Sequence, residues 1–142
     1  MAQDAETQQW ARANKACWEL RPLVEMHEGQ RVQVGFELDL YAQVGASLSA
    51  SAEDRLEALW QRLRDIAESL PALLAPGARI EVEPFEAADR LRPETAFAPE
   101  VMLQARLIHA SDYFAPVAEA DRQQVKPLED RLAALGLRQR CW

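Results

Sequence analysis

One short stretch of the sequence, EVMLQARLIHASDYF at residues 100–114, gathers side chains that could carry out acid–base chemistry. It contains His109, one of only two histidines in the chain, and Asp112 and Tyr113 follow within four residues. Because the ordinary pKa of histidine is about 6.5, an imidazole oriented by a carboxylate can act as a general base. The apolar alternation of residues 101–107, however, points His109 toward the buried side of a strand end. A histidine there more often serves the structure, and we favour that role.

A pocket near this strand end is the alternative, and its candidate residues are His109, Asp112, Tyr113 and Tyr41. Asp112 would orient the imidazole, although an aspartate at this place is also a natural turn residue or helix cap. Ser111 has none of the flanking glycines that expose a nucleophilic serine at a tight turn. We therefore assign no catalytic residue and lean against an enzyme.

Residue spacing gives little support to metal or cofactor chemistry. The cysteines Cys17 and Cys141 lie far apart, and the chain has no CxxC, HxxxH or HExxH spacing. Neither GxGxxG nor a phosphate-binding loop is present. Four acids fall on the polar sides of expected strands, and a flat strand face rarely converges oxygen ligands on a cation: Glu37, Asp39, Glu81 and Glu83. The sequence thus predicts neither a metal nor a cofactor.

The overall composition narrows the class of protein. The 142 residues suit one domain, and 49% apolar with 27% charged residues is ordinary for a globular chain. The formal net charge of −7 opposes binding to nucleic acids and to anionic membrane surfaces. The N-terminus lacks the pattern of a secretory signal, and no apolar run approaches the roughly 18 residues of a membrane span. These features predict a cytoplasmic protein with reduced cysteines.

Period-two alternation of apolar and polar residues predicts four strands, at residues 17–26, 31–43, 79–86 and 100–110. Pro22 and Pro84 have no N–H to donate, so the first and third strands are expected at the edges. The two longer strands are then expected side by side at the centre. Apolar stripes with helical spacing predict helices from Ser51 to Leu70 and from Val117 to Leu135, the second stopped by Gly136.

The turn between the first two strands can be predicted by matching their apolar faces. A two-residue turn at Glu28 and Gly29 would set Met26 against Arg31 and put the two apolar sets on opposite faces. A three-residue loop that begins at His27 keeps the apolar sets together and places Gly29 at the left-handed position of a bulged hairpin. We therefore expect the longer loop.

Together these elements predict an α+β fold. One mainly antiparallel sheet has four strands, with a fifth as an option, in ββαββα order, and both helices pack on one face. Residues 1–15 form a polar arm or short N-terminal helix, and residues 16–142 form the single domain. The alternative is a ferredoxin-like fold, in which the C-terminal residues add a strand beside residues 31–43.

The charges of the polar sheet face fit this strand order without any functional demand. Arg106 would lie between Glu37 and Asp39 on one side and Glu81 and Glu83 on the other. Opposite charges on neighbouring strands attract one another. We therefore interpret these residues as a solvated sheet face held by charge pairing.

Two classes of function are consistent with this reading. The favoured one is a small acidic protein that binds another protein or itself as a homodimer, through an edge strand, the open sheet face or the terminal tryptophans. Trp10 and Trp142 are the interface candidates, since aromatic residues often dominate such contacts. The alternative is a small-molecule or enzymatic pocket near His109, Asp112 and Tyr41.

Overall fold

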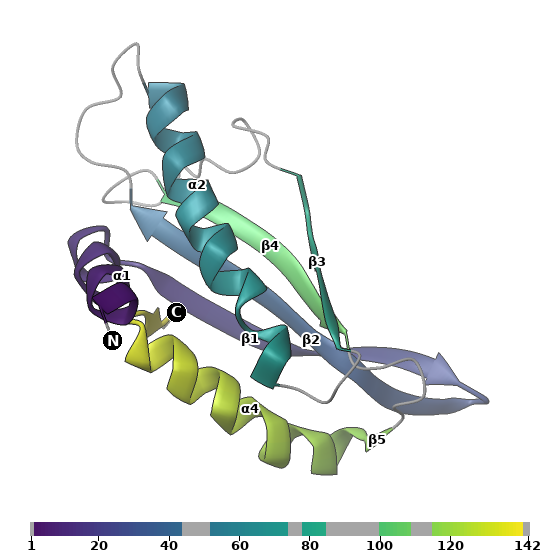
Figure 1. Cartoon of the computed structure of the whole chain (residues 1–142). Helices are drawn as coiled ribbons and strands as arrows, with labels where there is room; N and C mark the ends of the chain where they lie inside the picture. Colours follow the sequence, from purple (N-terminus) through teal and green to yellow (C-terminus); the bar gives the residue numbers. More distant parts are fainter. Residues whose placement is uncertain (1, 44–51, 74–77, 85–99, 109–114, 141–142) are drawn as a thin grey trace.

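The computed structural model describes residues 2–43, 52–73, 78–84, 100–108 and 115–140 (Figure 1). The described residues form these elements in chain order: α1 (Ala2–Ala13), β1 (Cys17–His27), β2 (Gln30–Gln43), α2 (Ala52–Glu68), the 3-10 helix η1 (Pro71–Leu73), β3 (Arg79–Val82), β4 (Glu100–Ile108), β5 (Ala115–Pro116), α4 (Val117–Ala134) and β6 (Arg138–Gln139).

The fold is α+β with one mixed sheet. The strand order is β3-β4-β2-β1-β6, and the short β5 pairs with β2. The long strands β2 and β4 pair antiparallel at the centre, whereas β6 runs parallel to β1. The described elements therefore depart from a plain ββαββα order, since β5 and β6 are added to it.

The C-terminal strand does not take the position that a ferredoxin-like fold requires. The ferredoxin-like alternative needs this strand beside β2, but β6 pairs with Cys17 and Trp18 of β1. The physical reason is that β1 and β4 already occupy the two sides of β2 along most of its length. The short β5 takes the part of β2 that β4 leaves unpaired, and β6 bonds at β1 instead.

The core lies on the face of the sheet that the helices cover (Figure 1). Phe36, Leu38, Leu103 and Leu107 are fully buried on that face. The helices contribute their apolar stripes: Trp60, Leu63 and Ile66 from α2, and Leu128 and Leu132 from α4. Burial of one such side chain contributes about 1.5–3 kcal/mol, so this shared apolar side is the main stabilising feature. The predicted one-sided core is confirmed.

The β1–β2 turn differs from the predicted three-residue loop, and that prediction is wrong. Met26 lies opposite Arg31 and His27 opposite Gln30, so the turn consists of Glu28 and Gly29 alone. Both residues have positive φ, 51° and 80°, as a two-residue turn that matches strand twist requires.

A bulge in β2 resolves the mismatch of faces that argued against the short turn. Leu23 lies opposite Gly35, but Val24 lies opposite Gln33, so Val34 is an extra residue on β2. The bulge reverses the alternation and buries Gln33 completely, while Val34 is only half-buried. Inside the core the Gln33 Nε2 donates to the Gly35 carbonyl at 3.0 Å.

Pro22 lies in β1, whereas β3 ends at Val82, so Pro84 lies just after a strand that is shorter than predicted. Neither proline is at a position where a neighbouring strand requires an N–H. The Trp18 carbonyl accepts a hydrogen bond from the Arg140 N–H at 2.8 Å, so the backbone groups of Trp18 point away from β2. Alternation along β1 points Pro22 in the same outward direction. On the other edge the Glu83 N–H donates to the Gln104 carbonyl of β4, so Pro84 points away from β4.

The N-terminal helix α1 is docked on the body of the protein. Ala11 is fully buried in the shared core. The Arg131 guanidinium of α4 donates two hydrogen bonds to the Asp4 carboxylate, at 3.0 and 3.2 Å. The Gln8 Nε2 donates to the Ala134 carbonyl at 2.6 Å, which occupies one of the end carbonyls of α4.

Candidate functional site

Of the four predicted pocket residues, only Tyr41 lies in the part of the chain that the structure describes. His109, Asp112 and Tyr113 lie outside the described residues. Tyr41 is buried on the polar face of the sheet, and the Arg140 guanidinium carbon stands 4.0 Å from the centre of its ring. Arg140, from the segment after β6, thus covers this end of the polar face.

The register places Tyr41 far from the strand end that precedes His109. Tyr41 lies opposite Met102, whereas Ile108, the last described residue of β4, lies opposite Gly35. The distance from Met102 to Ile108 along a strand is about 20 Å. Tyr41 is therefore at the other end of β4 from Ile108.

Of the two tryptophans predicted to form an interface, the structure describes only Trp10. Trp142 lies outside the described residues. Trp10 is half-buried against the core, and the Arg62 guanidinium carbon of α2 lies 5.5 Å from its ring centre. Part of the Trp10 ring is therefore used to hold α1 on the domain, and its role in an interface stays a prediction.

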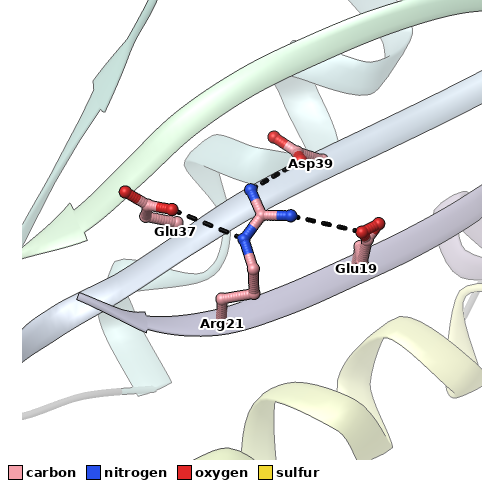
Figure 2. Close-up of polar contacts among 4 residues, drawn as sticks. All are labelled: Glu19, Arg21, Glu37 and Asp39. Carbon is pink, nitrogen blue, oxygen red and sulfur yellow. Dashed lines mark hydrogen bonds and ion pairs between the residues drawn. The ribbon is translucent and has the colours of Figure 1, made fainter.

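The best-defined group of charged side chains lies on the polar face of β1 and β2. Arg21 lies opposite Glu37, and Glu19 lies opposite Asp39, all on the side away from the helices. The Arg21 guanidinium donates to Asp39 at 3.0 Å, to Glu19 at 3.2 Å and to Glu37 at 3.4 Å (Figure 2). One guanidinium thus holds three carboxylates, and we call these four residues the Arg21 cluster.

The Arg21 cluster combines burial with an excess of negative charge. Asp39 is only 6% exposed, and burial raises the pKa of its carboxyl despite the opposing effect of Arg21. Burial lowers the pKa of Arg21, but Asp39, Glu19 and Glu37 outweigh this effect and raise it. Because one guanidinium neutralises only one of the three carboxylates, the cluster keeps a net negative charge.

A hollow of about 510 Å³ extends from the Arg21 cluster across the sheet. It runs over four strands and is lined mainly by charged and polar side chains: Arg21, Glu37, Asp39, Glu81, Glu83, Gln104 and Arg106. Four carboxylates face two guanidiniums there, so the hollow is negative. It lies on paired strands, which hold the side chains in fixed positions.

The charge pairing of this face differs in part from the prediction. The register does place Arg106 between Glu37 and Glu81, as expected. Among the described residues, however, the ion pairs of Glu37 and Asp39 are made with Arg21. The predicted three-residue loop would have paired Glu25 with Arg31. In that register Arg21 lies opposite Gly35 and not opposite Glu37, so the sequence did not predict the contact between Arg21 and Glu37.

A second hollow, of about 330 Å³, lies between α1, α2 and α4. Its two guanidiniums are already engaged, because Arg131 binds Asp4 and Arg62 stacks on Trp10. Arg131 and Arg62 therefore join the helices to one another. We regard it as a weaker candidate than the sheet face.

The described residues contain no group of histidines, cysteines and acids arranged to hold a metal ion. None of the helices within those residues is long and apolar enough to cross a membrane. The Cys17 thiol donates to the Lys15 carbonyl at 3.3 Å, and Cys141 lies outside the described residues. Comparison of the chain with protein-family models, with curated proteins and with solved structures gave no match.

Proposed function

We propose that this protein is a non-catalytic protein-interaction module that binds a basic segment of a partner protein on the open face of its sheet. The observation that carries the proposal is the negative hollow, in which four carboxylates face two guanidiniums on a rigid sheet. Complementary charges of this kind steer and orient a partner.

The exposure of the acids supports a binding role. The side chain of Glu37 is 39% exposed and Glu81 is also exposed, so a lysine or arginine of a partner can reach their carboxylates. Asp39, in contrast, is enclosed and holds Arg21. The enclosed acid fixes the cluster, and the exposed acids offer the contacts.

A binding titration tests the proposal. A fluorescent lysine-rich peptide is titrated with the protein, and a peptide of equal length with glutamate in place of lysine serves as the control. We expect the lysine peptide alone to bind, with an affinity that falls as salt rises. Equal binding of both peptides, or of neither, would contradict the proposal.

Two matched variants test whether the lysine peptide binds on the open face of the sheet. Glu81→Gln removes one negative charge from the hollow, and Glu57→Gln removes one from the exposed surface of α2. We expect the first variant to weaken peptide binding about threefold, as for a surface ion pair, and the second to leave it unchanged. Equal effects of the two variants would mean that only the overall charge matters.

A homodimer through the same face is the second candidate. Arg106 is exposed and makes no ion pair with the described residues, so its guanidinium is available to an acid of a second copy. Sedimentation equilibrium without peptide tests this, and Arg106→Gln should weaken the self-association. A protein that stays monomeric from micromolar to millimolar concentration would contradict the homodimer. The basic segment of a partner protein would then be the remaining candidate.

A further inference from the structure

Among the residues that the structure describes, the outer edge of β1 has no partner strand beyond the short strand β6. β6 pairs only with Cys17 and Trp18, and no other described strand lies beside β1 on that side. In Figure 1 the hairpin end of β1 and β2 extends past the ends of α2 and α4. An open strand edge offers N–H and C=O groups to which another strand can bond.

The hydrogen bonds to β6 show which backbone groups of β1 point outward. The Ala16 and Trp18 carbonyls accept from the N–H groups of Arg138 and Arg140, at 3.1 and 2.8 Å. The direction alternates along a strand, and the bulge adds its extra residue to β2 and not to β1. The outward positions that follow are Leu20, Pro22, Val24 and Met26.

Three of these four outward positions suit strand addition, and Pro22 does not. Leu20 and Val24 are half-buried, and Met26 is 67% exposed, so the edge presents apolar surface as well as backbone groups. Pro22 supplies no N–H, and its ring fills the space that an incoming carbonyl would take.

The charges along β1 favour a second copy of the same chain as the strand that would fit. In an antiparallel pairing centred on Leu23, Arg21 of each copy lies opposite Glu25 of the other. The same register sets Pro22 of each copy opposite Val24 of the other, so two ladder hydrogen bonds are lost per dimer. We propose that Pro22 keeps the β1 edge from pairing with the β1 edge of a second copy.

This proposal concerns a different surface from the open sheet face and does not depend on it. Pro22→Val restores the N–H at an outward position and leaves the β1–β2 ladder intact. We expect the association constant of the variant to rise at least about tenfold, because two ladder hydrogen bonds return per dimer. Sedimentation equilibrium from micromolar to millimolar concentration measures the change.

Two controls identify the edge. In the double variant with Pro22→Val and Val24→Pro, a proline again blocks an outward position, and we expect the wild-type association to return. Hydrogen exchange of the Pro22→Val protein should show the amides of Leu20 and Val24 protected as concentration rises. The open sheet face keeps its residues in both variants, so peptide binding should not change.

Three results would overturn the proposal. The first is a Pro22→Val protein that sediments as the wild type does at every concentration. The second is association of that variant without protection of the Leu20 and Val24 amides. The third is a wild-type protein whose Leu20 and Val24 amides already become protected as concentration rises.

Discussion

At the scale of single residues, close contact between two strand backbones decides which side chain a position tolerates. Gly35 is the clearest case, since a Cβ atom there would overlap the carbonyl oxygen of Leu107 on β4. Both groups belong to the paired centre of the sheet, so neither can move aside cheaply. The glycine next to the bulge is therefore required by contact.

We predict that Gly35→Ala destabilises the fold by about 3 kcal/mol, because the new methyl group must displace a central strand. Gly29→Ala is the control, since nothing lies within 4 Å of its Cβ position and only its φ of 80° opposes the change. That strain costs about 1 kcal/mol. Urea denaturation of both variants measures the difference, and equal losses would contradict the contact with Leu107.

Asp39 gives the unfolding free energy a dependence on pH with a definite sign. Burial raises the pKa of its carboxyl above the ordinary aspartate value, so the folded protein holds the proton more tightly than the unfolded chain. The stabilising contribution of Asp39 to the free energy of unfolding is therefore fully present at pH values below the pKa of the unfolded chain. It is lost as pH rises through the pKa of the folded protein.

We predict that the stability of Asp39→Asn, relative to the wild type, improves as pH rises from about 3 to 7, since aspartate has an unfolded pKa of about 3.9. Chemical denaturation at several pH values measures the two proteins side by side. Glu57→Gln, which changes an exposed acid of α2, is measured alongside as the control variant. A constant difference between wild type and Asp39→Asn would contradict the burial of this carboxyl.

At the scale of elements, α1 is held by polar contacts to α4 as well as by its apolar surface. Trp10 is half-buried and Ala11 is small, whereas Asp4 and Gln8 reach α4 directly. The hydrogen bond from Arg131 lowers the pKa of the Asp4 carboxyl. A lowered pKa means that the contribution is present above the unfolded value and is lost as pH falls through the folded one.

We predict that the amides of α1 lose protection from hydrogen exchange as pH falls through the lowered pKa of Asp4, earlier than the amides of β2. Asp4→Asn should show the reduced protection already at neutral pH, because the charge on Asp4 is gone. Glu6→Gln changes an exposed acid of the same helix and should leave the protection of α1 as it is. Identical behaviour of all three proteins would mean that the pair of Asp4 and Arg131 does not anchor α1.

The elements themselves were largely predictable because each carries its own periodic pattern. Apolar alternation located the long strands, and helical spacing located the stripe of α2 that is buried around Trp60. Gly136, with φ of 89°, ends α4 as its position predicted. The short strands β5 and β6 have only two residues each, so they carry no periodic signal.

The candidate site was predictable only in part, because the length of the turn between β1 and β2 was predicted incorrectly. The acids Glu37 and Asp39 were correctly placed on the polar face, because parity alone decides which face a strand residue occupies. Their partner Arg21 lies on another strand and depends on the register. The incorrect turn length shifted the predicted register of β1 against β2. The sequence analysis therefore named Arg106, and not Arg21, as the partner of Glu37 and Asp39.

At the scale of the whole molecule, the two faces of the sheet have separate roles. One face lies under the helices and carries the core, while the other presents the Arg21 cluster and the negative hollow. Pro22 of β1 and Pro84, which follows β3, both direct their backbone away from the neighbouring strand. The proposed partner contacts the polar face, and the proposed block to pairing lies on the β1 edge.

The sequence by itself determined that this chain forms strands and helices sharing one apolar side, because burial of apolar surface follows from residue type and local spacing. The tertiary structure decided the rest: the bulge at Val34, the choice of Arg21 as the partner of three acids, and the place of β6 beside β1. These features depend on which backbone groups of distant segments meet. No local pattern encodes such a meeting, since it is fixed only when all strands compete for the same hydrogen bonds.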